Sequence, residues 1–464
     1  MENFDIAVIG AGPGGYPAAI RAAQLGASVA IVEKEQPGGT CLNWGCIPTK
    51  TLIAAADTFA RISHAQALGI TVTGASVDYA AMIRHKDKVV GQLRSGIKQL
   101  LAANGVKLFT GAASFKDRST ISLGDSTVIG AAKVIIATGS TSAIPGFLPK
   151  HERIVESRRF LELVSLPRTL LVLGGGFIGC ELACMAAMLG VKVTVVELLE
   201  DILLLLDADV RREVRNAMER NLAVRVLTGK ALENIAADAA GARGNCGAEV
   251  LEADLLLSAV GRKPVTEGLN LEQAGLAANQ GGFIEADDYC RTRVATIYAI
   301  GDVTGKTQLA HYATAQGITA AENALGLKPR AHPTLVPNVI FTSPEVGAAG
   351  LSEEDARKQN RAVKIGRFRF GGLGKALAVG ETTGFVKWIA DAATGQLLGA
   401  AAVGPHATEL IAEAAAAIRA ELTARELGRT IHAHPTFSEA WMEAAHVLQG
   451  EAIHAAPKPI RAAL

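Results

Sequence analysis

A glycine turn set between two apolar strands occurs twice in this chain, and it constrains the fold more than any other feature. The first copy, residues 5–33, comprises a strand, a G-x-G-x-x-G turn with Gly10, Gly12 and Gly15, an alanine-rich helix, and a strand ending in Glu33. The first glycine of such a turn permits tight bending, the second lets a pyrophosphate approach the backbone, and the third lets helix and strand pack closely. A terminal acid accepts hydrogen bonds from ribose hydroxyls. The first copy is therefore predicted to bind a dinucleotide.

The second copy begins at residue 169 and supplies Gly174, Gly176 and Gly179. Glu197 closes it at the same interval from the first glycine as in the first copy. A carboxylate at this place favours NAD, because it binds the free 2′-hydroxyl and repels the 2′-phosphate of NADP. Residues 198–206 contain no arginine that would reverse this preference. The chain is therefore predicted to bind two dinucleotides, with NAD at the second turn.

The composition is typical of a water-soluble protein with several domains, since 464 residues with 49% hydrophobic and 20% charged side chains exceed one ordinary core. A net charge of +1 gives no electrostatic basis for binding nucleic acid or an anionic membrane. The longest apolar stretch, residues 170–196, is interrupted by glycines, Glu181 and Lys192, so we expect no membrane span. The first strand begins at residue 4, which leaves no room for a signal peptide, and six cysteines are too few for a secreted disulfide scaffold. We expect a cytoplasmic protein.

Two of the six cysteines, Cys41 and Cys46, lie in the segment TCLNWGCIPTK, where they could be metal ligands, a structural disulfide or a redox pair. A zinc site needs four ligands, usually in closely spaced pairs, and no second cluster has matching spacing, so no metal is expected. A structural disulfide across so short a loop would add little stability and would be reduced in the cytoplasm. A redox-active pair is favoured. A helix beginning near Pro48 would lower the pKa of a thiol at its N-terminus.

Near the C-terminus, the segment HAHPTFSE places His434 before a proline and Glu439 five residues later. A histidine held by a carboxylate is the usual way to build a proton acceptor that works near neutral pH. Pro435 is expected either to start a helix or to lock a His-Pro turn that directs the imidazole. A satisfied core or surface histidine is the alternative interpretation, and His432 is an equally titratable candidate.

Other apolar segments indicate how the chain passes between domains. Residues 134–140 and 255–264 are expected to be strands that end in glycine turns, where the chain could cross. A strand is expected within residues 297–305, and Asp302 lies at its carboxyl end, where α/β sheets bind ligands. The alternative interpretation of Asp302 is a helix N-cap. From residue 333 we expect a strand, a helix capped by Ser352, a pair of hairpin strands and an alanine-rich helix over about 406–422.

The motifs GAGPGGY, GGTCLNWGCIPTK, ATG, GGGFIGCELA, GRKP, AIGDV, LAH and HAHPTFSE occur in the order seen in flavoprotein disulfide reductases, and the chain resembles that family over nearly its whole length. The resemblance implies that Cys41 attacks the substrate and that Cys46 lies beside the flavin. It implies that Lys50 sits near the flavin, paired with Glu181. It also implies that His434 is the acid/base and reaches the cysteines of the other subunit. Glu439 is implied to orient the His434 ring.

The resemblance implies two cofactors, one tightly but non-covalently bound FAD per subunit and NAD+/NADH. The residues implied for FAD are Gly10, Gly12, Gly15, Glu33, Lys50, Thr138, Gly139, Asp302 and Ala310. Those implied for NAD are Gly174, Gly176, Gly179, Glu197 and Gly261. The implied partners are a second copy of the chain, forming a homodimer, and the lipoyl domains and core of a 2-oxoacid dehydrogenase or glycine cleavage complex.

The activity implied is oxidation of protein-bound dihydrolipoyl groups through a redox-active disulfide and FAD, with hydride transfer to NAD+. Another NAD(P)H-dependent, glutathione-reductase-like enzyme is one alternative, and a chain that mainly binds within a multienzyme complex is another. Trp44 and Gln316 depart from common family patterns without removing a catalytic group.

The expected fold is α/β, with two Rossmann-like dinucleotide-binding domains and an α+β C-terminal dimerisation domain. The expected divisions are residues 1–148 (FAD domain, first part), 149–265 (NAD domain), 266–332 (central, second part of the FAD domain) and 333–464 (dimerisation domain).

Overall fold

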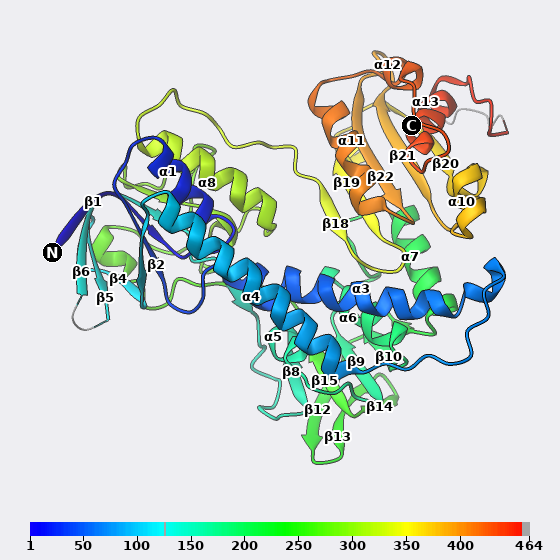
Figure 1. Ribbon diagram of the computed structural model, residues 1–464, viewed down its shortest axis with the longest axis horizontal. Helices are drawn as coiled ribbons and strands as arrows, with labels where there is room; N and C mark the ends of the chain where they lie inside the picture. The colour runs from blue at the N-terminus through cyan, green and yellow to red at the C-terminus, as the bar shows by residue number, and fades with distance from the viewer. Residues whose placement is uncertain (125–126, 457–464) are drawn as a thin grey trace.

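The computed structural model describes residues 1–124 and 127–456, and three large sheets with their own helices make up most of it (Figure 1). The first sheet has the strand order β3-β2-β1-β6-β5-β4, with β17 beside β6. Its strands are β1 (Glu2–Ile9), β2 (Val29–Glu33), β3 (Lys107–Thr110), β4 (Ala113–Phe115), β5 (Thr120–Leu123), β6 (Thr127–Ile136) and β17 (Ile297–Ala299). The chain therefore leaves this sheet after β6 and returns to complete it with β17.

Strands β1, β2, β3, β6 and β17 are parallel, whereas β5 pairs antiparallel with β6 and β4 pairs antiparallel with β5. Helices α1 (Gly15–Gln24) and α8 (Ala310–Ala324) pack beside each other against this part (Figure 1). The short apolar runs of β1 and β2 are buried on both faces, which is the pattern of a parallel sheet covered by helices.

The second sheet is entirely parallel, with the order β11-β10-β9-β15-β8. Its strands are β8 (Ile154–Glu156), β9 (Thr169–Leu173), β10 (Lys192–Val196), β11 (Arg225–Leu227) and β15 (Leu255–Ser258), and its helices are α5 (Ser157–Leu161), α6 (Phe177–Met188) and α7 (Ala208–Asn221). A smaller antiparallel sheet contains β12 (Glu233–Asp238), β13 (Gly241–Cys246) and β14 (Glu249–Ala253). Strands β7 (Ser140–Ser142) and β16 (Arg262–Pro264) pair antiparallel where the chain passes between the two large sheets.

Helix α3 (Cys46–Ile62) connects the first two parts of the molecule. It packs against α4 (Tyr79–Ala103) along one side and against α6 along another (Figure 1). Leu52 and Ala56 of α3 are fully buried in one core with Val172 and Leu257 of the second sheet. This packing fixes the start of α3, where Cys46 lies. Four 3-10 helices complete the connections: η1 (Ala65–Leu68), η2 (Leu271–Ala274), η3 (Gly301–Thr304) and η4 (Phe370–Gly372).

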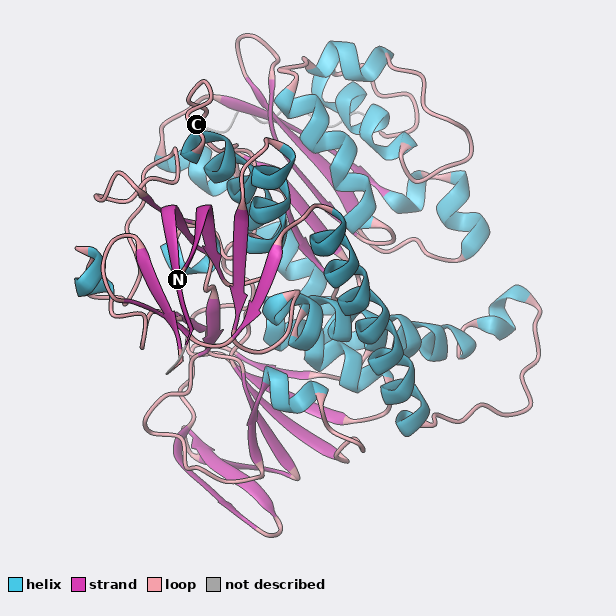
Figure 2. Ribbon diagram, turned by 60° about the vertical axis from the view of Figure 1, so that its left-hand side comes forward, coloured by secondary structure: helices cyan, strands magenta, loops and turns pink. Residues whose placement is uncertain are grey.

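The C-terminal part has an antiparallel sheet with the order β18-β19-β22-β21-β20, and its helices lie against that sheet (Figure 2). The strands are β18 (Asn338–Ile340), β19 (Val346–Gly350), β20 (Val363–Arg369), β21 (Phe385–Asp391) and β22 (Leu397–Val403). The helices are α9 (Glu353–Lys358), α10 (Gly374–Val379), α11 (Ala407–Arg419), α12 (Ala424–Arg429) and α13 (Glu439–Gln449). Trp388 and Trp441 pack together in its core, with ring centroids 4.7 Å apart.

The structure confirms the expected fold class and several local predictions. Ser352 caps α9 by accepting a hydrogen bond from the Asp355 N–H at 3.0 Å, and β21 and β22 form the expected antiparallel pair. Cys180 and Cys184 are fully buried in α6, where they serve as small core residues. Within residues 1–124 and 127–456, no helix is both long and apolar enough to span a membrane. Residues 457–464 of the expected dimerisation domain lie outside the described part of the chain.

Candidate active site

The two cysteines of the predicted redox pair lie at adjoining helix ends. Cys41 is in α2 (Gly39–Trp44), and Cys46 is the first residue of α3, so this helix begins slightly earlier than the expected start near Pro48. Both are half-buried free thiols. A thiol at a helix N-terminus faces the positive end of the helix dipole, which favours the thiolate.

The two cysteine thiols differ in pKa. The hydrogen bond from the Cys41 thiol lowers the pKa of Cys46 to about 7 against the effect of burial, and the charge of Lys50 adds to this lowering. The same hydrogen bond, together with burial, raises the pKa of Cys41. In the reduced pair, Cys46 is therefore the thiol that ionises more readily.

Lys50 is anchored one turn along α3 from Cys46. Its Nζ lies 2.8 and 3.0 Å from the two carboxylate oxygens of Glu181, a buried residue of α6. Glu181 Oε1 also accepts the backbone N–H of Phe341 at 2.9 Å, and Lys50 Nζ lies 4.6 Å from the centre of the Phe341 ring. The ion pair therefore holds the charge of Lys50 at the junction of three segments that are far apart in the sequence.

The first glycine turn has the geometry that a bound dinucleotide needs. A Cβ atom on Gly10 would lie 2.4 Å from the Ala137 oxygen, and one on Gly15 would lie 1.8 Å from the Gly10 oxygen. A Cβ on Gly12 would meet nothing closer than 3.8 Å. The outer glycines are thus required for packing, whereas the middle one leaves the backbone approachable. Glu33 accepts the Ala11 N–H at 2.8 Å through Oε2 and the Glu35 N–H at 2.9 Å through Oε1.

The second turn repeats this geometry. A Cβ on Gly174 would lie 2.5 Å from the Ala259 oxygen and one on Gly179 would lie 2.0 Å from the Gly174 oxygen, whereas a Cβ on Gly176 would meet no atom within 4 Å. Glu197 accepts the Gly175 N–H at 2.6 Å through Oε2 and the Leu199 N–H at 2.8 Å through Oε1. In both turns the terminal acid therefore accepts the N–H of the residue before the middle glycine and the N–H two residues after itself. These two hydrogen bonds fix its carboxylate beside the glycine turn.

Asp302 lies in η3, directly after β17. Its Oδ2 accepts the Ser140 hydroxyl at 2.5 Å and lies 3.8 Å from Arg262 Nε, and Arg262 itself donates to the Ser140 oxygens. The N-cap of η3 is Ile300, and that of the following helix α8 is Leu309, so the alternative interpretation of Asp302 as a helix cap is wrong. Asp302 instead lies beside the β7–β16 crossing.

The remaining predicted cofactor residues lie at turns and at one helix end. Thr138 donates its hydroxyl to the Val265 oxygen at 2.6 Å. Gly139 and Gly261 both have positive φ, 68° and 121°. Ala310 is the first residue of α8. Thr138, Gly139 and Gly261 lie within the two segments, 134–140 and 255–264, where the sequence predicted chain crossings.

His434 presents an accessible imidazole. Its Nδ1 lies 2.8 Å from Glu439 Oε1, and Glu439 Oε2 accepts the Thr436 N–H at 2.8 Å. These contacts lower the pKa of Glu439, although its partial burial works in the opposite direction. The His434 side chain is 75% exposed. Of the two alternatives expected for Pro435, the structure has the second: the His434–Pro435 peptide is cis and lies in a turn, and helix α13 begins only at Glu439.

A cavity of about 430 Å³ opens beside Cys41. Its walls come from the first glycine turn, α2, the start of α3, α4 and α8, and the residue furthest along the chain is Thr314. Leu93, Ile97 and Leu100 of α4 give it an apolar side. Among the described residues, none of the C-terminal part lines it.

Comparison with known proteins agrees with this geometry. The family model for pyridine nucleotide-disulphide oxidoreductases matches residues 4–317, and the model for the dimerisation domain of that family matches residues 336–445. The chain belongs to the pyridine nucleotide-disulphide oxidoreductase family. The second match identifies the C-terminal part as the family's dimerisation domain.

Relatives and solved structures of the pyridine nucleotide-disulphide oxidoreductase family match almost the whole chain. The dihydrolipoyl dehydrogenases of Chlamydia muridarum and Halobacterium salinarum are 42% and 43% identical to it, covering 98% and 97% of this chain and 99% and 97% of theirs. The crystal structure of LpdA from Mycobacterium tuberculosis superposes with a TM-score of 0.89 at 27% identity, covering 96% of this chain and 99% of that one. The HOCl-induced flavoprotein disulfide reductase RclA of Escherichia coli gives 0.86 at 29% identity, covering 94% and 98%.

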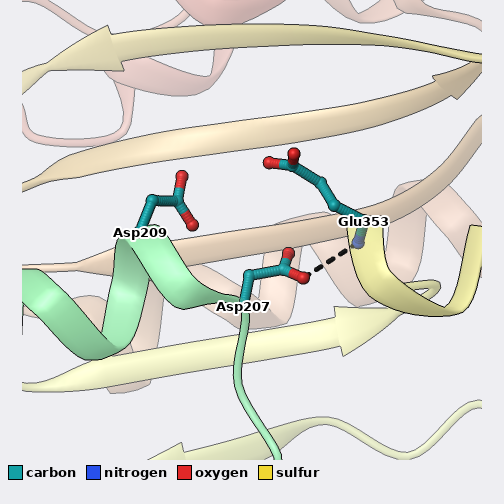
Figure 3. Close-up of side chains that lie close together, drawn as sticks. All are labelled: Asp207, Asp209 and Glu353. Carbon is teal, nitrogen blue, oxygen red and sulfur yellow. Dashed lines mark hydrogen bonds between the residues drawn. The ribbon is translucent and has the colours of Figure 1, made fainter. Parts of the chain in front are cut away.

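The sequence did not predict a cluster of carboxylates where the part built on the second sheet meets the dimerisation domain. Asp207, Asp209 and Glu353 lie close together at the starts of α7 and α9 (Figure 3). Their spacing would suit a cation, but the Nζ of Lys387 lies 2.7, 2.9 and 2.8 Å from them. The Lys387 side chain is 0% exposed. The buried ammonium group of Lys387, together with the Arg367 guanidinium that contacts Asp209 and Glu353, offsets the charge of the three acids and ties the two parts together.

Proposed function

We propose that the chain is a dihydrolipoyl dehydrogenase, which oxidises dihydrolipoyl groups and reduces NAD+. The observation that carries the proposal is the pair of free thiols, Cys41 and Cys46, at adjoining helix ends, with the Lys50 ammonium group held one turn along α3 by Glu181. The full-length likeness to proteins named dihydrolipoyl dehydrogenase supports the choice of substrate.

The two sulfurs suit successive steps of a thiol–disulfide exchange. A substrate thiolate attacks the Cys41 sulfur of the oxidised pair, the Cys41–Cys46 bond breaks, and Cys46 leaves as a thiolate. A thiol with a pKa of about 7 is a good leaving group at neutral pH. The second substrate thiolate then displaces Cys41, and the cyclic lipoyl disulfide is released. The electron pair is left on the cysteines.

His434 is proposed to take the proton from the first substrate thiol and to return a proton to Cys41. Glu439 fixes the ring through Nδ1, which leaves Nε2 free to accept. Because none of the dimerisation-domain residues up to 456 lines the cavity at Cys41, we assign the base to the second subunit of a homodimer.

FAD is proposed to bind at Gly10, Gly12, Gly15 and Glu33, with Thr138, Gly139, Asp302, Ala310 and Lys50, and NAD+ at Gly174, Gly176, Gly179, Glu197 and Gly261. Both glycine turns fit such ligands, since of the three motif glycines in each turn only the middle one has space beside its Cα. The chemistry that bound FAD supplies is passage of the electron pair from the dithiol to NAD+. Lys50 then places a positive charge near the Cys46 thiolate, and Glu181 keeps that charge fixed.

The proposal also covers the domain organisation of the chain and its binding partners. Residues 1–148 and 266–332 would form the FAD domain, 149–265 the NAD domain, and the chain from 333 the dimerisation domain. Lipoyl domains and the core of a 2-oxoacid dehydrogenase or glycine cleavage complex are the proposed partners. A reducing, cytoplasmic setting suits a cysteine pair that must cycle.

The direct test mixes purified protein with dihydrolipoamide and NAD+ and follows NADH absorbance. NADP+ in place of NAD+, and reduced glutathione in place of dihydrolipoamide, serve as parallel controls. NADH formation only with dihydrolipoamide and NAD+ is the expected result. Disulfide reduction driven by NADPH, with no reaction in the first mixture, would contradict the proposal and favour a glutathione-reductase-like enzyme.

A further inference from the structure

Trp44 lies between the two cysteines of the redox pair in the sequence and contacts a helix of the second sheet. It is the last residue of α2, the helix that carries Cys41. The Cζ atom of Arg158, on α5, lies 3.8 Å from the centre of the Trp44 ring, which is the separation of a guanidinium group stacked on an indole. The indole thus packs against α5 instead of forming part of the wall of the cavity beside Cys41. The proposed mechanism gives this contact no task.

The same guanidinium group contacts the chain just before α2. Arg158 Nη1 lies 3.0 Å from Glu35 Oε2, and Arg158 Nε lies 3.6 Å from Glu162 at the end of its own helix. The Glu35 N–H donates to Glu33, the acid that closes the first glycine turn, at 2.9 Å. One side chain of the second part therefore contacts both Glu35 and Trp44, the two ends of the segment that contains α2.

Helix α5 gives Arg158 a fixed base. Glu156 caps the helix by accepting the N–H groups of Arg158 at 2.8 Å and of Arg159 at 2.9 Å. Phe160 and Leu161 of α5 are buried in the core that includes the second sheet. The position of the guanidinium group is therefore set by the second part of the molecule.

The two cysteines lie on helices that are anchored in different cores. Leu42, which follows Cys41 in α2, is buried in the core of the first sheet. Leu52 of α3, the helix that begins with Cys46, is buried in the same core as α5. Gly45 alone separates α2 from α3, and a glycine leaves the backbone free to bend. The contact between α2 and α5 therefore also fixes α2 relative to α3.

We propose that Arg158 is a positioning residue for the redox pair, because its contacts with Trp44 and Glu35 keep α2 in place beside α3. Cys41 then stays within bonding reach of Cys46 after the disulfide opens. The inference rests on the proposed redox cycle of these two cysteines.

The contact should shift the thiol–disulfide equilibrium of the pair toward the disulfide. In the dithiol form, α2 gains freedom to move once it is released from α5. In the disulfide form, the covalent bond restricts α2 in any case. Loss of the contact therefore favours the dithiol, because only that form gains conformational entropy. A purely structural contact would have no such preference for one redox form.

The experiment equilibrates the holoenzyme with mixtures of reduced and oxidised dithiothreitol. In this exchange the dithiothreitol dithiol gives two electrons and two protons to the Cys41–Cys46 bond, which opens to two thiols, and dithiothreitol closes to its cyclic disulfide. Alkylation under denaturing conditions, followed by mass measurement, adds two more labels to the dithiol form than to the disulfide form.

Arg158→Met keeps a side chain of similar reach but removes the guanidinium group. We expect the equilibrium constant to shift about fivefold toward the dithiol, the size of one partly exposed cation–π contact. For a two-electron couple, fivefold corresponds to a rise of ~20 mV in reduction potential. Trp44→Val should give a similar shift, and the double variant should add little to either single change.

A conservative variant and a neighbouring arginine separate the stacked contact from other effects. Trp44→Phe keeps an aromatic face for the cation, so it should retain most of the wild-type equilibrium. Arg159→Met removes the next arginine of α5, whose side chain is 67% exposed and lies 3.6 Å from Glu162. It should leave the equilibrium unchanged. An Arg158→Met equilibrium equal to that of the wild type, or an equal shift in Arg159→Met, would overturn the inference.

The result is distinguishable from a failure of the proposed function. Dithiothreitol replaces the lipoyl substrate, so the equilibrium reports on Arg158 even if the wild type does not oxidise dihydrolipoamide, an outcome that would refute the proposed function alone. A wild-type enzyme that never forms the Cys41–Cys46 bond in these mixtures would refute both.

Discussion

Lys50 Nζ lies 2.8 Å from Glu181 Oε2, and this ion pair joins the helix that begins at Cys46 to the helix that follows the second glycine turn. The contact connects the thiolate of the redox pair to the part of the molecule that is proposed to bind NAD+. Lys50 and Glu181 are far apart in the sequence, so it is the fold that pairs them and holds the positive charge of Lys50 near the cysteines.

Replacing Lys50 with Met should raise the pKa of Cys46, because a positive charge that lowers it is removed. The midpoint of iodoacetamide alkylation of the reduced enzyme, followed against pH, should move from about 7 toward the ordinary cysteine value of about 8.5. Lys50→Arg keeps the charge and should retain most of the lowering. An alkylation midpoint that does not move in the Met variant would show that Lys50 does not act on this thiol.

His434→Gln should reduce dihydrolipoamide oxidation by about 10²–10⁴-fold, the usual contribution of general base catalysis. Oxidation of NADH by a dye should stay within about twofold of the wild type, since this reaction needs no proton acceptor at Cys41. Steady-state assays on one preparation give both rates. Equal losses in the two assays would refute the assigned role.

Two glycines of the second turn should respond differently to alanine. Gly179→Ala places a Cβ 2.0 Å from the Gly174 oxygen and should lower the thermal midpoint, because backbone must move. Gly176→Ala meets no protein atom within 4 Å, so the fold should be kept. If NAD+ approaches there, its KM should rise roughly tenfold, a loss of ~1.4 kcal/mol. An unchanged KM in Gly176→Ala would place NAD+ elsewhere.

Lys387→Met should destabilise the protein, because three carboxylates would lose the one buried cation that contacts all of them, and Arg367 would offset only part of their charge. Removing one member of a buried ion cluster costs about 3–5 kcal/mol. Differential scanning calorimetry should show a lower midpoint, and millimolar Ca²⁺ should partly restore it, since the three acids then suit a cation (Figure 3). Lys364→Met on the neighbouring strand β20 controls for the loss of one charge. A midpoint equal to that of the wild type would show that the cluster contributes no stability.

The sequence predicted those parts of the molecule that depend on local pattern. Each glycine turn with its terminal acid is a local unit, and Glu33 and Glu197 make the same contacts in the structure. Helix α11 and the β21–β22 pair are also set by local composition and spacing. These features could be read without knowing any distant contact.

Contacts between distant segments could not be predicted in this way. Lys387 is a lone cation in an apolar strand, and nothing near it in the sequence shows that Asp207 will meet it. His432 and Glu413 come from different elements, so spacing gave no reason to pair them. The choice between a helix start and a turn at Pro435 also depended on a contact that the sequence did not show, because the Thr436 N–H is taken by the Glu439 side chain before α13 begins.

The most direct test of the account mixes two inactive variants, Cys41→Ser and His434→Gln, lets their subunits exchange, and measures NADH formation from dihydrolipoamide and NAD+. A mixed dimer has one site with both Cys41 and His434 if each site is built from two chains. Random exchange should then restore about a quarter of the wild-type rate, because half the dimers carry one intact site of two. Activity that stays at the level of the separate variants, although exchange is shown by mass, would contradict a dihydrolipoyl-oxidising site shared between subunits.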